Sequence, residues 1–177
     1  MSKTPYIRIA TPSDVSKLCE IGTKTFVDTY GADNTPENLK EYIETRFNEK
    51  QISDELNTPN TVFLLVELDQ DVIGYARMRV NLEENPDEKS IEIERIYIDK
   101  AYHGQKCGAL LMQACIDNAI QRGYTSIWLG VWEHNPKAIA FYQKWGFEVF
   151  GTHIFQLGDD AQTDYLMKKE LSVHEKR

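Results

Sequence analysis

A loop near the middle of the chain combines glycines with a position suited to binding a phosphate group. It runs between an expected strand and the start of an expected helix, as His103-Gly104-Gln105-Lys106-Cys107-Gly108. Free backbone N–H groups and the positive end of a helix can hold a pyrophosphate there, and glycine lets the backbone approach it. The loop lacks the Gly-Lys-Ser/Thr ending of a P-loop and the full Rossmann glycine set, so by itself it also suits an ordinary connection.

The segment just before this loop changes its side-chain alternation beside a carboxylate. Apolar residues occupy positions 91 and 93 and then 96 and 98, so the alternation slips by one position across Glu94 and Arg95. A strand has a fixed side-chain period of two, so the slip predicts an extra residue, that is, a β-bulge. Bulges redirect side chains and often flank active sites, which draws attention to Glu94.

The elements of the first third follow from helix start signals. A short strand at 6–10 leads into Thr11-Pro12-Ser13-Asp14, a capping-box pattern that begins a helix expected to run to about Tyr30. Thr35-Pro36-Glu37 starts a second helical stretch, with a break expected before Ile52. This region is therefore predicted to be a strand followed by helices.

The rest of the chain predicts mainly strands, with two helices between them. Asp69-Gln70-Asp71 is typical of a hairpin turn, and Gly123 and Gly146 can end the two helices. The expected elements are, in order, strands at 62–68 and 72–80, the bulged strand at 91–98, a helix through 110–119, a strand at 126–132, a helix opened by Asn135-Pro136, and strands at about 147–157 and 163–171. The strand-helix-strand unit in the middle implies a parallel pair.

Composition limits the function classes. With 177 residues, of which 41% are hydrophobic, we expect one domain over residues 1–171, followed by a frayed tail at 172–177. The formal charge of −8 argues against nucleic acid or an anionic membrane as the main partner. Without a membrane-spanning run or a signal-peptide core, a cytoplasmic location is expected. The oligomeric state is left open, with a homodimer among the expected outcomes.

Cysteine and histidine patterns predict no metal site. The three cysteines show no CxxC spacing, and the four histidines form no HExxH or similar arrangement. We expect the cysteines to be small core or loop residues.

Taken in order, these parts resemble the GNAT acetyltransferases. The resemblance rests on the bulged strand, the glycine-containing turn, the helix, the strand ending Val131-Trp132, and the run from Asn135 to Phe147, and it covers roughly residues 60 to 170. Within that superfamily the chain looks like the bacterial Pai-type spermidine/spermine N-acetyltransferases, through the runs 93–98, 127–133 and 138–142 and Gly158 to Asp164 near the end.

The resemblance implies a fold and a donor site. The fold is α/β (α+β), a mixed, mostly antiparallel sheet of about seven strands with helices on both faces and a parallel pair, 91–98 and 126–132, that splays apart. The pantetheine arm of acetyl-coenzyme A would lie between the two strands, and the pyrophosphate would lie on the loop. The implied contacts are Ile96, Tyr97, Ile98, His103, Gly104, Gln105, Lys106, Cys107, Gly108, Ala109, Asn135 and Lys144.

Two residues depart from the family pattern in the loop. The pattern is Arg or Gln, two residues, Gly, one residue, then Gly or Ala, whereas this chain has His103 at the first position and Lys106 at the first glycine position. The side chain of Lys106 would either obstruct the phosphates or, pointing outward, add a favourable charge. We expect binding to survive, because the backbone N–H groups remain.

The implied chemistry needs a base, an oxyanion donor and an acid. Tyr142 matches the family's general-acid tyrosine, and an ordinary pKa of about 10 keeps its proton in place at neutral pH. Glu94 is the expected base, with Glu92 or a water chain as alternatives, and the donor is expected to be a backbone N–H near Ile98. A core-facing tyrosine and a solvated strand face are the structural alternatives, as helix capping is for Asn135.

These residues predict an acetyl-coenzyme A-dependent N-acetyltransferase for a primary amine, acting by direct transfer in a ternary complex. The expected acceptor is a cationic polyamine such as spermidine or spermine, near acidic residues of the first helices, namely Asp28, Asp33, Glu37, Glu41 and Glu44. A protein N-terminus or lysine is the alternative acceptor. A different class is a non-catalytic acetyl-coenzyme A sensor, motivated by Lys106 and opposed by the intact Tyr142.

Overall fold

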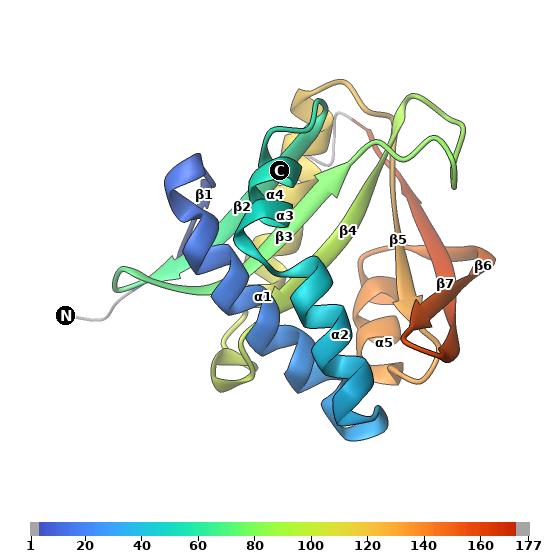
Figure 1. Ribbon diagram of the computed structural model, residues 1–177. Coiled ribbons are helices and arrows are strands. Elements are labelled where there is room, and N and C mark those ends of the chain that lie inside the picture. Colours follow the sequence, from blue (N-terminus) through green and yellow to red (C-terminus); the bar gives the residue numbers. More distant parts are fainter. Residues whose placement is uncertain (1–3, 173–177) are drawn as a thin grey trace.

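A single seven-stranded sheet runs through the protein. The computed structural model describes residues 4–172, and its strand order is β1-β2-β3-β4-β5-β7-β6 (Figure 1). Neighbouring strands are antiparallel except for the parallel pair β4 and β5. The strands are β1 (Tyr6–Ile9), β2 (Thr61–Leu68), β3 (Asp71–Arg79), β4 (Ser90–Ile98), β5 (Ser126–Trp132), β6 (Glu148–Leu157) and β7 (Asp160–Glu170). The predicted mixed, mostly antiparallel sheet is therefore confirmed.

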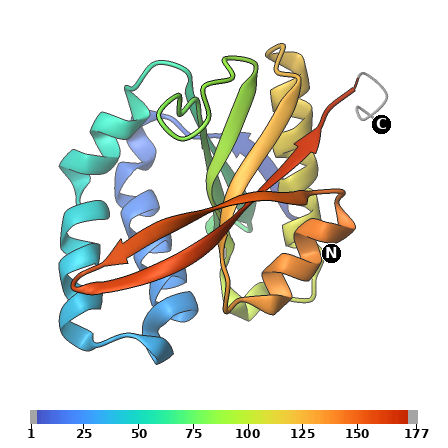
Figure 2. The ribbon, with the colours of Figure 1, turned by 90° about the vertical axis from the view of Figure 1, so that its right-hand side faces the viewer.

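Helices cover both faces of this sheet, as Figure 2 shows, with the first three on one side and the last two on the other. They are α1 (Val15–Tyr30), α2 (Pro36–Arg46), α3 (Glu49–Leu56), α4 (Cys107–Gln121) and α5 (Pro136–Lys144). Two buried clusters follow from this arrangement. One packs α4 and α5 against the sheet through residues such as Leu111 and Tyr142, and the other packs α1 to α3 through residues such as Leu18 and Ile52.

Local signals in the sequence account for most of the element ends. The backbone N–H of Thr11 donates to Asp14 Oδ2 at 2.8 Å, although this first turn, Pro12–Asp14, is a 3₁₀ helix that precedes α1. Thr35 Oγ1 accepts from the N–H of Asn38 at the start of α2. Asp69 and Gln70 both have positive φ, as a tight hairpin turn requires. The last strand begins at Asp160, three residues earlier than predicted.

The predicted bulge lies in β4. Arg77 of β3 is opposite Arg95, but the next residue, Met78, is opposite Ile93, so Glu94 is the extra residue. The slip in side-chain alternation therefore has the expected cause.

Two predictions concern the ends and the environment of the chain. The frayed tail was expected at 172–177, of which 173–177 lie outside the described residues. Within residues 4–172, none of the helices is long and apolar enough to cross a membrane.

Candidate active site

The parallel strands β4 and β5 separate halfway along their length. Their ladder pairs Ser90–Ile93 with Ser126–Leu129 and ends there, although both strands continue (Figure 1). At the paired end, Ser126 Oγ and Ser90 Oγ are 2.7 Å apart and both residues are buried. The bulge at Glu94 comes directly after the last pair, so it marks the point where β4 turns away from β5.

Backbone groups of β4 remain directed toward β5 beyond this point. The N–H of Asp99 donates to the carbonyl of Ile73 in β3 at 2.8 Å, so the backbone of the odd-numbered residues here faces β3. Successive residues of a strand direct their backbone groups to opposite sides, so those of Ile96 and Ile98 face β5. This is the orientation that the predicted pantetheine contacts require.

Tyr97 differs from its two neighbours. It lies opposite Tyr75, on the side of β4 that is paired with β3, so its backbone is not directed toward the gap. Its side chain packs near Tyr75, with ring centroids 6.3 Å apart, and hydrogen-bonds with the hydroxyl of Tyr30 from α1. Burial raises the pKa of Tyr97 to about 12. Its side chain therefore packs with the cluster on the α1–α3 face, and its backbone is not placed for the predicted cofactor contact.

The start of α4 offers unpaired backbone donors. The first bond of the helix runs from the N–H of Leu110 to the carbonyl of Lys106 at 3.1 Å, so the three N–H groups of residues 107–109 have no acceptor within the helix. Lys106 occupies the N-cap position and supplies no side-chain cap. These donors, with the positive helix end, fit a pyrophosphate.

Lys106 adopts the conformation that glycine takes most easily. Its φ is 65° and its ψ is 14°, in the left-handed region, which explains why a family glycine stands here. The side chain of Lys106 is exposed, so it leaves the backbone donors accessible. Gly104, also with positive φ, and Gln105 are exposed as well, whereas Cys107 is buried.

His103 has a partner within the protein. Its Nε2 lies 2.8 Å from the backbone oxygen of Ile98. This contact ties the loop to the end of β4, and the phosphate contact of His103 stays a prediction. Among the described residues, no group of three or more His, Cys, Asp and Glu side chains could hold a metal ion.

Helix α5 presents the candidate acid. Asn135 Oδ1 accepts from the N–H of Ala138 at 3.2 Å, so Asn135 caps the helix, and Lys144 is exposed at its other end. Tyr142 is 8% exposed, and burial raises its pKa above the ordinary value, with Tyr97 and Cys115 as further contributors. Tyr142 belongs to the same buried cluster as Ile93 and Leu129, the last residues that pair β4 with β5, so it lies on the face of the sheet where β4 leaves β5.

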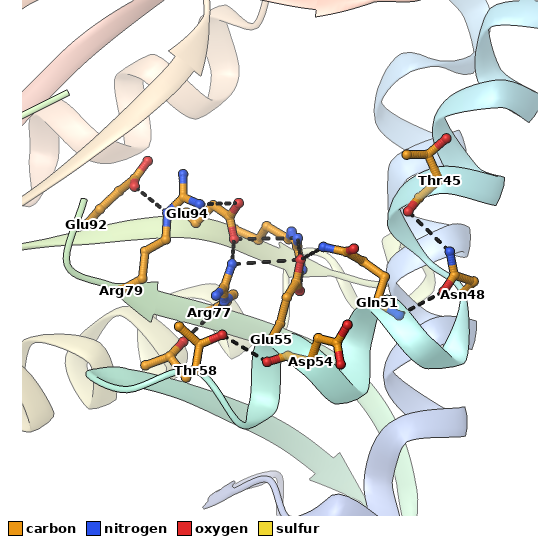
Figure 3. A network of polar contacts seen from close by, with 12 residues as sticks. Thr45, Asn48, Gln51, Asp54, Glu55, Thr58, Arg77, Arg79, Glu92 and Glu94 are labelled. Carbon is orange, nitrogen blue, oxygen red and sulfur yellow. Dashed lines mark hydrogen bonds and ion pairs between the residues drawn. The ribbon is translucent and has the colours of Figure 1, made fainter. Parts of the chain in front are cut away.

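Glu94 belongs to a buried ion-pair network, which Figure 3 shows. Its carboxylate contacts Arg77 at 2.6 Å, Arg79 at 3.2 Å and Arg95 at 3.5 Å. Arg95 in turn donates twice to Glu55 of α3, at 2.8 Å each. Although burial opposes ionisation, the three guanidinium groups lower the pKa of Glu94 to about 2.

This network argues against the predicted role of Glu94 as the base. A carboxylate with such a low pKa, held by three arginines, has little tendency to take a proton near neutral pH. The alternative, Glu92, lies where β4 and β5 are still paired. It accepts from Arg79 at 2.8 Å and from Asn81 at 3.2 Å, although burial raises its pKa. We therefore propose that Glu94 stabilises the bulge, and Glu92 stays an alternative base that is held by Arg79 and Asn81.

A carboxylate that the sequence reading missed lies on the other side of the gap. Asp164 of β7 is opposite Trp132, the last residue of β5. Its Oδ1 is buried without a hydrogen-bond partner, and burial raises its pKa to about 6. The sequence gives no local signal for this, because the environment of Asp164 depends on strands that are distant in the chain.

A comparison of the sequence with models of known protein families identifies the family of the chain. The model of the Acetyltransferase (GNAT) family matches residues 23–147. The class is thus that of acyltransferases. The chain belongs to the GNAT acetyltransferase family.

Individual relatives agree with this assignment. An uncharacterized N-acetyltransferase of Lactobacillus delbrueckii subsp. lactis is 38% identical over 160 residues, which cover 89% of this chain and 92% of the relative. A spermine/spermidine N(1)-acetyltransferase of Bacillus subtilis (strain 168) is 30% identical over 84 residues, 46% of this chain and 55% of the relative. The solved structure of the PaiA N-acetyltransferase from Thermoplasma acidophilum, in complex with coenzyme A, has a TM-score of 0.80 at 22% identity, covering 94% of this chain and 99% of that one.

Proposed function

We propose that this protein transfers the acetyl group of acetyl-coenzyme A directly to a primary amine, and that the preferred acceptor is a cationic polyamine. The observation that carries the reaction is the separation of β4 from β5 with Tyr142 against it. The backbone groups of Ile96 and Ile98 would bind the pantetheine arm, and an N–H near Ile98 would stabilise the negative charge on the acetyl oxygen.

Support for a polyamine acceptor is separate and comes from chemistry and partial similarity. An overall charge of −8 mildly attracts cations, and the Bacillus subtilis relative is named for spermine and spermidine. Of the acidic residues predicted to line the site, Asp28 is already paired with Lys24 at 3.1 Å and with Lys100 at 3.7 Å. Asp28 therefore contributes less to attracting a cation than the sequence suggests.

In this proposal Tyr142 is the acid that protonates the departing thiolate. Burial keeps its proton in place at neutral pH, since the charged phenolate would be poorly solvated. The phenol oxygen loses its proton to sulfur only when the carbon–sulfur bond breaks, and it regains one from the nitrogen of the product.

The experiment is release of free thiol from acetyl-coenzyme A, with spermidine, spermine, lysine and a short peptide offered in parallel. Release with the polyamines alone supports the whole proposal. Release with the peptide alone retains the chemistry and replaces the acceptor by a protein. No release with any acceptor, although calorimetry still detects binding of acetyl-coenzyme A, would leave a non-catalytic sensor as the remaining function.

Replacing Tyr142 with Phe tests the acid. We expect kcat to fall about 100-fold, as loss of a general acid does, while the affinity for acetyl-coenzyme A changes little. The matched control is Tyr124→Phe, because the ring of Tyr124 packs against Arg122 at the far end of α4. Unchanged turnover in Tyr142→Phe would remove Tyr142 from the mechanism.

A further inference from the structure

The side chain of Asp164 lies beside Gly130, the one position of β5 without a side chain. A Cβ atom built on Gly130 would lie 3.4 Å from Asp164 Oδ2 and 3.7 Å from Leu166, so both side chains flank the space above Gly130. Gly130 is exposed although the other residues of β5 are buried. Solvent therefore reaches the centre of the sheet beside Asp164, one residue beyond the last β4–β5 pair.

The position of Asp164 also connects it with the candidate acid. Tyr30 and Tyr97, whose hydroxyl groups are hydrogen-bonded to each other, both lie within electrostatic range of Asp164. Tyr97 is in turn within range of Tyr142. Tyr97 packs with the cluster on the α1–α3 face and Tyr142 with the cluster on the α4–α5 face, and Tyr97 is within electrostatic range of both Asp164 and Tyr142.

The polar surroundings of Asp164 leave one of its oxygen atoms without a partner. Oδ1 is buried and accepts no hydrogen bond, although a buried carboxylate oxygen is costly to leave unpaired. The groups that face it are Tyr30 from α1, Tyr97 from β4 and His153, which is directly opposite on β6. These groups include one weak cation, His153, and no arginine or lysine, in contrast to the three arginines around Glu94.

We propose that the carboxylate of Asp164 receives the acceptor amine as its ammonium ion and takes the proton that the nitrogen must lose before it attacks. This rests on the proposed function and adds the residue that prepares the nucleophile. The carboxylate, whose Oδ1 has no partner, then has a ligand of matching charge, and solvent access at Gly130, beside its Oδ2, is the route by which an amine reaches the carboxylate.

The step balances in protons and bonds. The nitrogen loses two protons in total, of which Asp164 accepts the first. The neutral nitrogen forms a bond with the acetyl carbon, the carbon–sulfur bond breaks, and Tyr142 gives its proton to the sulfur. The second nitrogen proton restores Tyr142. The proton on Asp164 leaves through His153, whose Nε2 lies 3.4 Å from Glu84 on the surface loop.

The test is Asp164→Asn, which keeps the shape of the side chain and removes its basicity. At pH 7, kcat/KM for the best amine should fall by about 100-fold, while acetyl-coenzyme A affinity stays within about twofold of that of the parent. The deficit should shrink as the pH rises toward 9.5, because solution then supplies the neutral amine directly. A purely structural role predicts a deficit that does not change with pH.

Two further measurements keep the test decisive. Asp160→Asn is the matched control on the same strand, since Asp160 is exposed and accepts a hydrogen bond from Gln162, two residues away, and it should retain parental activity. The melting temperature of Asp164→Asn at pH 8 should equal or exceed that of the parent, because the amide removes a buried charge, so a loss of activity is not a loss of folding.

The failures of the two proposals are distinguishable. A parent protein that releases no thiol with any amine refutes the proposed function itself. A parent that is active, together with an Asp164→Asn variant that matches it or that is impaired equally at every pH, overturns the assignment of Asp164.

Discussion

Two partly buried carboxylates lie on either side of the separated strands, and their surroundings differ. Glu94, on the bulge of β4, contacts three arginines, and its pKa is lowered to about 2. Asp164, on β7, has an oxygen without a partner, and burial raises its pKa to about 6. The comparison teaches that burial alone does not identify a base: the partners decide whether a carboxylate stabilises the fold or stays available to take a proton.

The largest effect on stability is expected from breaking the Arg95–Glu55 pair, the most buried hydrogen-bonded pair of the network around Glu94. Arg95→Met removes the two hydrogen bonds that Arg95 donates to the buried Glu55 and leaves that carboxylate with Gln51 and the more distant Arg77, so we expect a loss of about 3 kcal/mol in the free energy of unfolding. Urea denaturation measures it. The double variant Glu55→Gln/Arg95→Met should recover part of the loss, because it also removes the buried negative charge at position 55. No recovery would mean that packing of Arg95, such as over Phe47, dominates.

A smaller effect on stability, without a comparable effect on catalysis, is expected at Glu94 itself. Glu94→Gln weakens charge-assisted bonds to Arg77 and Arg79 and should cost about 2 kcal/mol. Thiol-release assays at pH 7 should give a kcat within about threefold of the parental value, because a carboxylate this acidic is not the base. A 100-fold loss in kcat would show that Glu94 takes part in catalysis, and the proposed difference in role between Glu94 and Asp164 would then be wrong.

The pH dependence of stability sharpens the comparison, since folding shifts the pKa values of the two carboxylates in opposite directions. The contribution of Glu94 is present above its unfolded pKa of 4.5 and is lost as the pH falls through about 2, so the advantage of the parent over Glu94→Gln should shrink in acid. Ionisation of Asp164 destabilises the fold as the pH rises from 3.8 through about 6, so Asp164→Asn should gain relative to the parent over that interval. Denaturation series from pH 3 upward would show both trends.

The smallest effect is expected at the departure from the family loop pattern. Lys106→Gly removes the strain of a non-glycine residue in the left-handed conformation, but it also gives the unfolded chain more conformational freedom. These two contributions to the free energy of unfolding, about 1 kcal/mol each, nearly cancel. Acetyl-coenzyme A affinity, measured by calorimetry, should change less than about threefold because the Lys106 side chain is exposed. A large loss would show that the lysine binds the phosphates directly.

The sequence predicted those features that local patterns determine. The hairpin turn at Asp69, the bulge at Glu94 and the cap at Asn135 each depend on a few neighbouring residues, and the structure confirms them. The family resemblance supplied the arrangement of the sheet and placed Tyr142.

The sequence could not predict features that depend on distant contacts. Glu94 lost its expected role because Arg77 comes from another strand and Arg95 is itself fixed by Glu55, 40 residues away in the chain. Asp164 was missed because its surroundings include Gly130 of β5 and Tyr30 of α1, neither of which is near it in sequence. Contacts between distant elements therefore determine which carboxylate is paired with cations and which is not, and local sequence patterns do not show these contacts.

The missing side chain at Gly130 also offers a practical handle for trapping one complex of the enzyme. A methyl group there would meet its neighbours at 3.4 Å or more, which is ordinary contact, so Gly130→Ala should fold. The same methyl group would occupy space beside Asp164 that an acceptor nitrogen needs. Such a variant would hold the thioester donor without consuming it, which makes it suited to crystallising the donor complex with its acetyl group intact.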